Sequence, residues 1–167
     1  VTPTGTPTVT PTPGPTLIST SAPTLVPFIA YQDNFNDPNS GWGMDSNDDL
    51  EIGYLSGEYR IAPKKPNQPL AVLHPATSFS EFSFQVKARH DGAAVGGDYG
   101  LVFRREDRDN FYLFSVDPVN RAYVFVKREL GSWVSIIDRT SSPHILGTGP
   151  NVLRVIARGS NFELYVN

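Results

Sequence analysis

The chain has 167 residues, with 14 Lys and Arg, 17 Asp and Glu, a formal net charge of −3 and no cysteine. The lack of cysteine excludes disulfides, thiolate metal sites and a cysteine nucleophile. Nucleic-acid binding is not expected, because it needs a concentrated basic face and no basic run here exceeds two residues. No apolar run approaches the ~20 residues of a membrane span, so direct insertion of this chain into a membrane is not expected.

Residues 1–27 form the first predicted segment, an extended linker or stalk. Residues 1–24 read VTPTGTPTVTPTPGPTLISTSAPT, with a recurring Thr-Pro-Thr unit and no charged residue. Proline fixes φ and lacks an N–H donor, and a segment with so few bulky apolar groups does not bury a core. Thr/Pro-rich stalks are typical of secreted or surface-anchored proteins. We therefore expect an extracellular or cell-surface module tethered to a larger chain, with an ordinary disordered tail as the alternative.

Residues 28–167 are predicted to be one all-β domain. No stretch shows a 3.6-residue apolar period, and Phe, Tyr, Val and Ile gather in short runs between turn residues. This pattern predicts a two-sheet antiparallel β-sandwich of the jelly-roll kind. No turn follows the last strand, so we expect the domain to be truncated at its C-terminal strand. The predicted strands are 28–35, 51–55, 58–62, 69–73, 81–90, 99–105, 110–116, 121–129, 132–139, 151–158 and 161–167.

Apolar and polar residues alternate most clearly over residues 82–89, FSFQVKAR. Since successive side chains of a strand point to opposite faces, its apolar residues are expected to face the core. Trp133, at the start of a predicted strand, is interpreted as a packing residue. The aromatic residues that fit core positions are Phe35, Phe82, Phe84, Phe103, Phe111 and Phe162.

The segment DNFNDP at residues 33–38 is followed by Gly41-Trp42. Further signature segments are 57–61, 99–104, 110–114, 131–133, 151–155 and 162–167. Together these segments, which cover essentially all of residues 31–167, resemble bacterial domains with the concanavalin A-like lectin/glucanase fold. That group includes laminin G-like domains and the domain named for 3-keto-disaccharide hydrolases. The resemblance implies the jelly-roll fold, but this fold carries lectins, glycosidases and adhesion modules alike.

Catalytic patterns are absent from the sequence. A glycosidase needs two carboxylates flanking the scissile bond, and the resemblance implies that glucanases of this fold carry them as Glu-x-Asp-x-(x)-Glu on one strand. No such spacing occurs, since Asp138 and Glu163 each stand alone on their strands. There is no Gly-x-Ser-x-Gly nucleophile elbow and no His-Glu-x-x-His motif. We therefore expect no enzymatic activity.

An acidic loop is a candidate calcium site. Asp45, Asn47 and Asp49 have the alternate spacing of calcium loops, and their hard oxygen ligands suit Ca²⁺. The loop departs from an EF-hand at Leu50 and Ser56, which replace the required Gly and bidentate Glu. The alternative interpretation is a solvated acidic turn.

A carbohydrate site would combine aromatic rings, which cover the apolar face of a sugar, with planar polar groups for its hydroxyls. On the predicted strand 110–116, Tyr112 lies on the face opposite Phe111 and Leu113, which is assigned to the concave face of one sheet. The predicted ligand-binding residues are Arg104, Tyr112, Tyr123 and Lys127 on that face, with Trp42 from a loop.

The leading hypothesis is thus a non-catalytic extracellular binding module of a larger bacterial protein, with a glycan or cell-surface polysaccharide as partner. The first alternative is a structural or sensory ectodomain that binds protein, which should expose an apolar patch. The second is a glycoside hydrolase-like enzyme of the 3-keto-disaccharide hydrolase type, which should gather acidic, His or Lys groups around a metal in its groove.

Overall fold

A computed structural model describes residues 29–66, 69–74, 79–91 and 97–167. The predicted linker at residues 1–27 lies outside these ranges. The chain contacts divide it into two compact units, Val1–Asp33 and Asn34–Asn167. In the described part of the first unit, residues 29–33, the Tyr31 hydroxyl donates to Asp33 at 2.9 Å. All strands of the described residues belong to the second unit.

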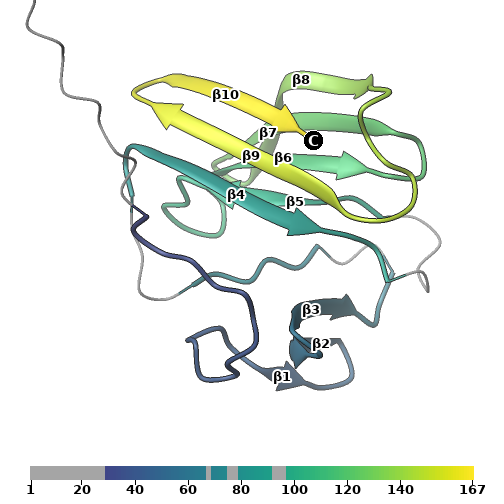
Figure 1. Ribbon diagram of the computed structural model, residues 1–167. Helices are drawn as coiled ribbons and strands as arrows, with labels where there is room; N and C mark the ends of the chain where they lie inside the picture. Colours follow the sequence, from purple (N-terminus) through teal and green to yellow (C-terminus); the bar gives the residue numbers. More distant parts are fainter. Residues whose placement is uncertain (1–28, 67–68, 75–78, 92–96) are drawn as a thin grey trace, which may run out of the picture. The chain divides into compact units, whose positions relative to one another are not determined.

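The described residues are all β, in three antiparallel sheets without any helix, which confirms the predicted class (Figure 1). No helix among them is long and apolar enough to cross a membrane. A small sheet has the order β1-β2-β3, and the two larger sheets have the orders β10-β9-β4 and β5-β6-β7-β8. The strands are β1 Asp45–Ser46, β2 Leu50–Leu55, β3 Glu58–Pro63, β4 Phe82–Ala88, β5 Tyr99–Phe103, β6 Phe111–Asp117, β7 Ala122–Glu129, β8 Ser132–Ser141, β9 Asn151–Arg158 and β10 Asn161–Val166.

Two predicted strands are wrong in the described residues. Residues 29–35 form no strand, because Phe35 takes a positive φ of 59° and the Asn34 side chain accepts the Asn36 N–H at 3.1 Å, which bends the chain. The run 69–73 also forms no strand. It begins with Pro69 and is soon followed by Pro75, and proline supplies no N–H to a ladder. Conversely, the two-residue strand β1 was not predicted.

The two larger sheets pack face to face as a β-sandwich (Figure 1). Alternate residues of each strand point inward, so that the four-stranded sheet and the central strand β9 of the other sheet share one core. Partly buried residues of β4 and β10 complete it, among them Phe82 and Phe162. The buried core cluster is Leu101, Phe103, Phe114, Val116, Phe125, Ile145, Leu153 and Val155.

The faces of β6 are the reverse of the predicted ones. Phe114 is 2% exposed and Tyr112 packs against the core, whereas Phe111 lies on the outer face beside Trp133. Both faces of this strand are apolar, so its sequence alone does not show which face points to solvent. The neighbouring strand β5 does, because its buried Phe103 lies opposite Tyr112.

Two other residues assigned to the core have different positions. Phe84 is 38% exposed although it shares a face with Phe82, because β4 is the edge strand of its sheet. Phe35 belongs to a separate aromatic cluster that packs on the small sheet. That cluster comprises Phe35, Trp42, Tyr54, Tyr59 and His74, with ring centroids 5.2–6.4 Å apart.

Ion pairs connect the small sheet to the sandwich. Arg89, just after β4, contacts Glu58 of β3 through two hydrogen bonds of 3.1 and 2.6 Å. Arg60 of β3 lies 3.3 Å from Asp91. The β2–β3 turn favours glycine at position 57, because φ is 78° there and the Asn36 side chain, 2.9 Å from the place of a Cβ, would have to move for any other residue.

Candidate functional site

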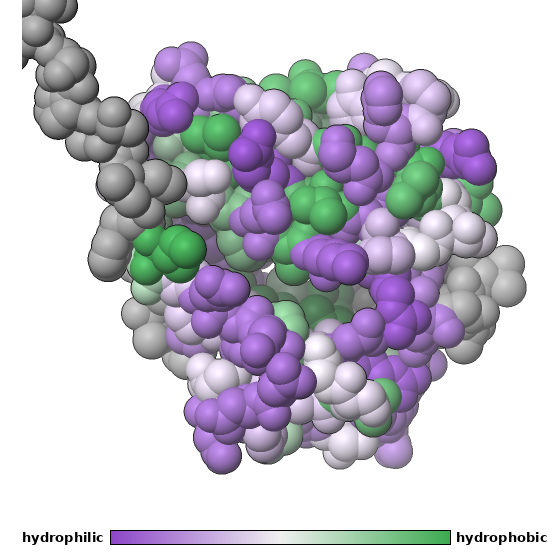
Figure 2. Space-filling model, in the orientation of Figure 1, coloured by the Kyte–Doolittle hydropathy of each residue, from purple (hydrophilic) through white to green (hydrophobic). Residues whose placement is uncertain are grey.

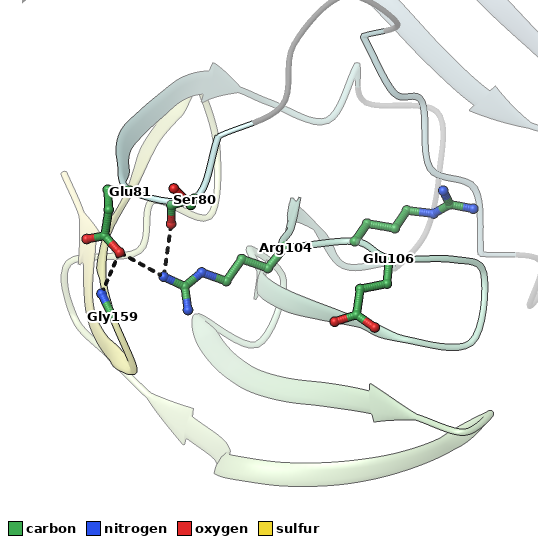
Figure 3. A pocket seen from close by; sticks show the side chains of 6 residues that line it. Ser80, Glu81, Arg104, Glu106 and Gly159 are labelled. Carbon is green, nitrogen blue, oxygen red and sulfur yellow. Dashed lines mark hydrogen bonds and ion pairs between the residues drawn. The ribbon is translucent and has the colours of Figure 1, made fainter.

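An open pocket lies beside the end of β5, where the β5–β6 loop meets the start of β4 and the β9–β10 turn (Figure 3). Its volume is about 560 Å³, and apart from one glycine the residues that line it are charged or hydroxyl-bearing. Segments from distant parts of the sequence therefore converge on one hollow. The lining residues are Ser80, Glu81, Arg104, Arg105, Glu106 and Gly159.

Arg104 is held firmly in this pocket. Its Nη2 donates to the Ser80 carbonyl at 3.0 Å and lies 3.8 Å from a Glu81 carboxylate oxygen, as Figure 3 shows. Its guanidinium carbon lies 5.0 Å from the centroid of the Phe162 ring, within cation–π range. The same Glu81 oxygen accepts the Gly159 N–H at 2.8 Å, so one carboxylate fixes both the arginine and the turn.

Arg105 and Glu106 line the pocket differently. Within the described part of the chain, neither side chain makes a hydrogen bond or an ion pair. In Figure 3 the Glu106 carboxylate lies well away from the Arg104–Glu81 contact. A guanidinium offers up to five N–H donors and a carboxylate accepts at both oxygens, so these two residues supply free donors and acceptors at the pocket wall.

The loop that presents these residues is ordered by its own side chains. The Asp107 carboxylate accepts the Asp109 N–H at 2.7 Å and the Asn110 amide at 2.9 and 3.0 Å. These hydrogen bonds, Asn110 first, with a smaller contribution from the charge of Arg105, hold the pKa of Asp107 below its ordinary value. The Glu106 N–H donates to the Asn110 carbonyl at 3.0 Å and closes the loop. The pocket wall is thus formed before any ligand arrives.

The structure brings three predicted ligand-binding residues together here, namely Arg104, Tyr112 and Lys127. The ring centroids of Tyr112 and Phe162 are 5.0 Å apart, and the Lys127 ammonium lies 6.0 Å from the Tyr112 centroid. Lys127 also pairs with Glu129 at 2.5 Å, which raises the pKa of Lys127. Of the three, only Arg104 lines the pocket, and Tyr112 packs against the core and does not form an open platform.

The other two predicted residues lie elsewhere. Tyr123 packs against the core beside Phe114, near the opposite end of β7 from Lys127, at a separation of about 13 Å along the strand. Trp42 belongs to the aromatic cluster of the small sheet. The predicted set therefore does not form a single concave surface.

The predicted calcium loop forms a compact turn. Asn47 uses its side-chain oxygen to accept the N–H groups of Asp49 and Leu50 at 2.8 and 3.2 Å, and its amide donates to Asp45 at 3.1 Å. Lysines reach the same loop, since Lys65 pairs with the Asp49 carboxylate and Lys64 donates to the Asn47 carbonyl at 2.6 Å. No group of three or more His, Cys, Asp or Glu residues placed to share a metal occurs in the described residues. A calcium ion would have to compete with Lys65 here.

A pair of carboxylates that the sequence did not indicate meets on Arg139. Its Nη2 lies 2.7 Å from Asp98, and its Nη1 lies 3.1 Å from Asp117, which is 7% exposed. Burial alone would raise the pKa of Asp117, but hydrogen bonds from Asn120 and the charge of Arg139 outweigh burial and lower it. A general acid of a glycosidase needs the opposite shift, so this arrangement suits a structural ion pair.

Sequence reasoning missed the other pocket residues, above all Arg105 and Glu106. A charged loop between two strands is typical of an ordinary solvated turn, and nothing in the sequence connects it with Ser80 or Gly159. Comparison of the chain with family models, with curated proteins and with solved structures gives no match. The functional argument therefore depends on the geometry of the chain itself.

Proposed function

We propose that this chain is a non-catalytic binding module that takes a glycan in the pocket at the end of β5. The observation that carries the proposal is the contrast between Arg104 and the two residues that follow it in the pocket wall. Arg104 is held by contacts within the protein, whereas the next two residues, Arg105 and Glu106, line the pocket and make no hydrogen bond or ion pair within the described residues.

The chemistry of the pocket matches a saccharide better than a charged ligand. The charges of the lining residues balance, since Arg104 contacts Glu81 and the other two charged residues, Arg105 and Glu106, have opposite signs. A site with balanced charges gains little from a net ligand charge, but it can hydrogen-bond several hydroxyl groups that both donate and accept. We therefore take a neutral glycan as the ligand class.

The alternatives have less support. A protein-binding ectodomain should carry a large exposed apolar patch, and on the face in Figure 2 hydrophilic residues predominate, although Trp133, Val134 and Ile136 of β8 are 44–50% exposed. A hydrolase needs two free carboxylates at the scissile bond, and in this pocket Glu81 is already engaged by Arg104 and Gly159.

The proposed setting follows from the Thr/Pro-rich residues 1–24, which favour a stalk on the surface of a cell or in a secreted protein. A stalk of this kind would hold the module away from the rest of a larger bacterial chain, within reach of a cell-surface polysaccharide. A direct check is limited proteolysis of the full-length parent protein, in which cleavage should concentrate in this segment.

The test is binding of the 167-residue chain to a broad glycan panel, repeated with Arg105→Ala and Glu106→Gln. Because Arg105→Ala removes a charged donor, and Glu106→Gln removes the charge and one of the two acceptor oxygens, we expect each to weaken binding roughly tenfold or more. Arg108→Ala is the matched control, since its side chain is 88% exposed in the same loop and does not line the pocket. Equal binding by all four proteins would contradict the proposed site.

A further inference from the structure

Trp133, at the start of β8, is 50% exposed. The predicted packing role therefore accounts for only part of its surface. One edge-to-face contact fixes the indole against Phe111, with ring centroids 5.6 Å apart at 86°. The Arg128 guanidinium lies 5.2 Å from the indole centroid. Trp133 therefore has a set orientation and a large area left open.

The surroundings of Trp133 are tied to the pocket loop. Arg128 lies 3.3 Å from Asp109, and the Asp109 carbonyl accepts the Gly131 N–H at 3.1 Å. The Leu130 N–H donates to the Asn110 side chain at 3.0 Å. The β7–β8 turn is thus pinned to the β5–β6 loop, so the indole is held in a fixed place relative to that loop.

The indole and the pocket are connected through the β5–β6 loop. Glu106 lines the pocket, and Asp109 of the same loop contacts Arg128, which lies against the indole. The chain from Glu106 to Asp109 extends at most about 11 Å, so a ligand of several sugar units that runs from Glu106 over this loop approaches the indole. A single sugar ring in the pocket would leave the indole uncovered.

We propose that Trp133, with Arg128 beside it, is a second contact surface for the same ligand, so that the module binds a glycan chain of several sugar units instead of a mono- or disaccharide. This inference rests on the proposed function of the pocket. The exposed half of the indole suits the apolar C–H face of a sugar ring, and the Arg128 guanidinium, which lies over the ring and contacts Asp109, helps to fix the indole in place. Leu130, which is 85% exposed, adds apolar surface beside the turn.

A second copy of the chain is a poorer occupant. Pairing between copies would use the free edge of β8, but two register shifts interrupt the pairing of β8 with β7. Asp138 and Arg139 stand at one of these irregularities. Bulges and charges are the devices by which edge strands avoid pairing with other chains. These features disfavour the pairing of two copies through β8.

The experiment is a length series of neutral oligosaccharides, from disaccharide to hexasaccharide, of β-linked glucan, xylan and α-linked glucan. Affinity is measured by titration calorimetry for the wild-type chain, Trp133→Ala and Trp133→Phe. Ile136→Ala is the control, because Ile136 is a comparably exposed apolar residue on the same strand. Unfolding midpoints establish that each variant is folded.

Wild-type affinity should rise with chain length. Trp133→Ala should lose roughly five- to tenfold for the hexasaccharide and nothing for the disaccharide, Trp133→Phe should lose less, and Ile136→Ala should match the wild type. Equal affinity of Trp133→Ala and wild type at every length, with Arg105→Ala still impaired, would overturn this inference and leave the pocket proposal standing. Binding to no glycan at all, or binding indifferent to Arg105→Ala, would overturn the proposed function and this inference with it.

Discussion

The guanidinium of Arg104 lies over the ring of Phe162, 5.0 Å from its centroid, and so joins the end of β5 in one sheet to β10 in the other. Arg104 also holds the segment before β4 through the Ser80 carbonyl. The residue that the sequence singled out as a ligand contact is therefore a clamp between the sheets. The proposed function accordingly assigns ligand contact to Arg105 and Glu106.

Arg104→Ala should lower the free energy of unfolding by about 1–2 kcal/mol, because it removes a charged hydrogen bond and a cation–π contact at a partly exposed site. Arg104→Gly should be less damaging by about 1 kcal/mol, since the backbone here has φ of 47° and only glycine adopts that region without strain. Urea unfolding of the two variants measures the difference. A glycine variant less stable than the alanine variant would contradict the clamp and strain argument.

Asn151 should be the polar side chain on which the core depends most. It is fully buried, and its amide donates to the Tyr99 hydroxyl at 2.8 Å and the Leu146 carbonyl at 3.0 Å, while its oxygen accepts the Leu146 N–H at 2.8 Å. Asn151→Ala leaves several buried groups unpaired and should cost about 2–4 kcal/mol of stability. Tyr99→Phe loses one bond and should cost about 1 kcal/mol.

The two changes should also be coupled. In the Asn151→Ala background the Tyr99 hydroxyl has already lost this partner, so Tyr99→Phe should cost less than in the wild type. A double-mutant cycle of unfolding free energies measures this. Strict additivity would mean that the bond contributes nothing to stability.

The free energy of unfolding should fall in acid, because Asp117 becomes protonated there. Its pKa is lowered in the folded state, so its contribution is complete above the ordinary carboxyl pKa of 3.8 and is lost as the pH falls through the lower folded value. Urea midpoints from pH 6 to pH 2 should therefore decline below about pH 4. Asp117→Asn should start less stable at pH 6 and decline less steeply. A variant with the wild-type slope would show that another carboxylate controls the acid response.

The calcium prediction is testable at Lys65. Because its ammonium pairs with Asp49, Ca²⁺ must displace it, and Lys65→Ala should bind Ca²⁺ more tightly than the wild type does. Thermal melts with Ca²⁺ and with EDTA give the readout, and Asp49→Asn is the control that should abolish the response. If Ca²⁺ raises the melting temperature of neither the wild type nor Lys65→Ala, the loop is a solvated turn.

The sequence predicted the bounds of the later strands closely. The bounds of β9 were predicted as 151–158, and β10 differs from its prediction by one residue. Which face of a strand points inward was harder to predict. Over β6 both faces are apolar, so only pairing with β5 shows that Tyr112 points inward. The predicted strand 69–73 failed because local β propensity was weighed above its flanking prolines.

The candidate site was only partly predictable for a similar reason. Arg104 and Lys127 stood out as cations next to aromatic strands, but a loop such as 104–110 looks like any charged hairpin turn. Arg105, Glu106 and Gly159 line one pocket because the packing of the two sheets brings together segments that are far apart in the sequence. The Asp98–Arg139 pair could not be predicted for the same reason, because the two residues are 41 positions apart in the sequence.

Glycan binding in the pocket is tested most directly by titrating the 167-residue chain with the glycan that binds best in the panel and following the backbone amide signals by NMR. The pocket account predicts concentration-dependent shifts centred on Arg105, Glu106 and Gly159, with Asp117 and Arg139 unmoved as an internal control. Shifts centred on another surface, or none at a concentration where calorimetry shows saturation, would contradict it.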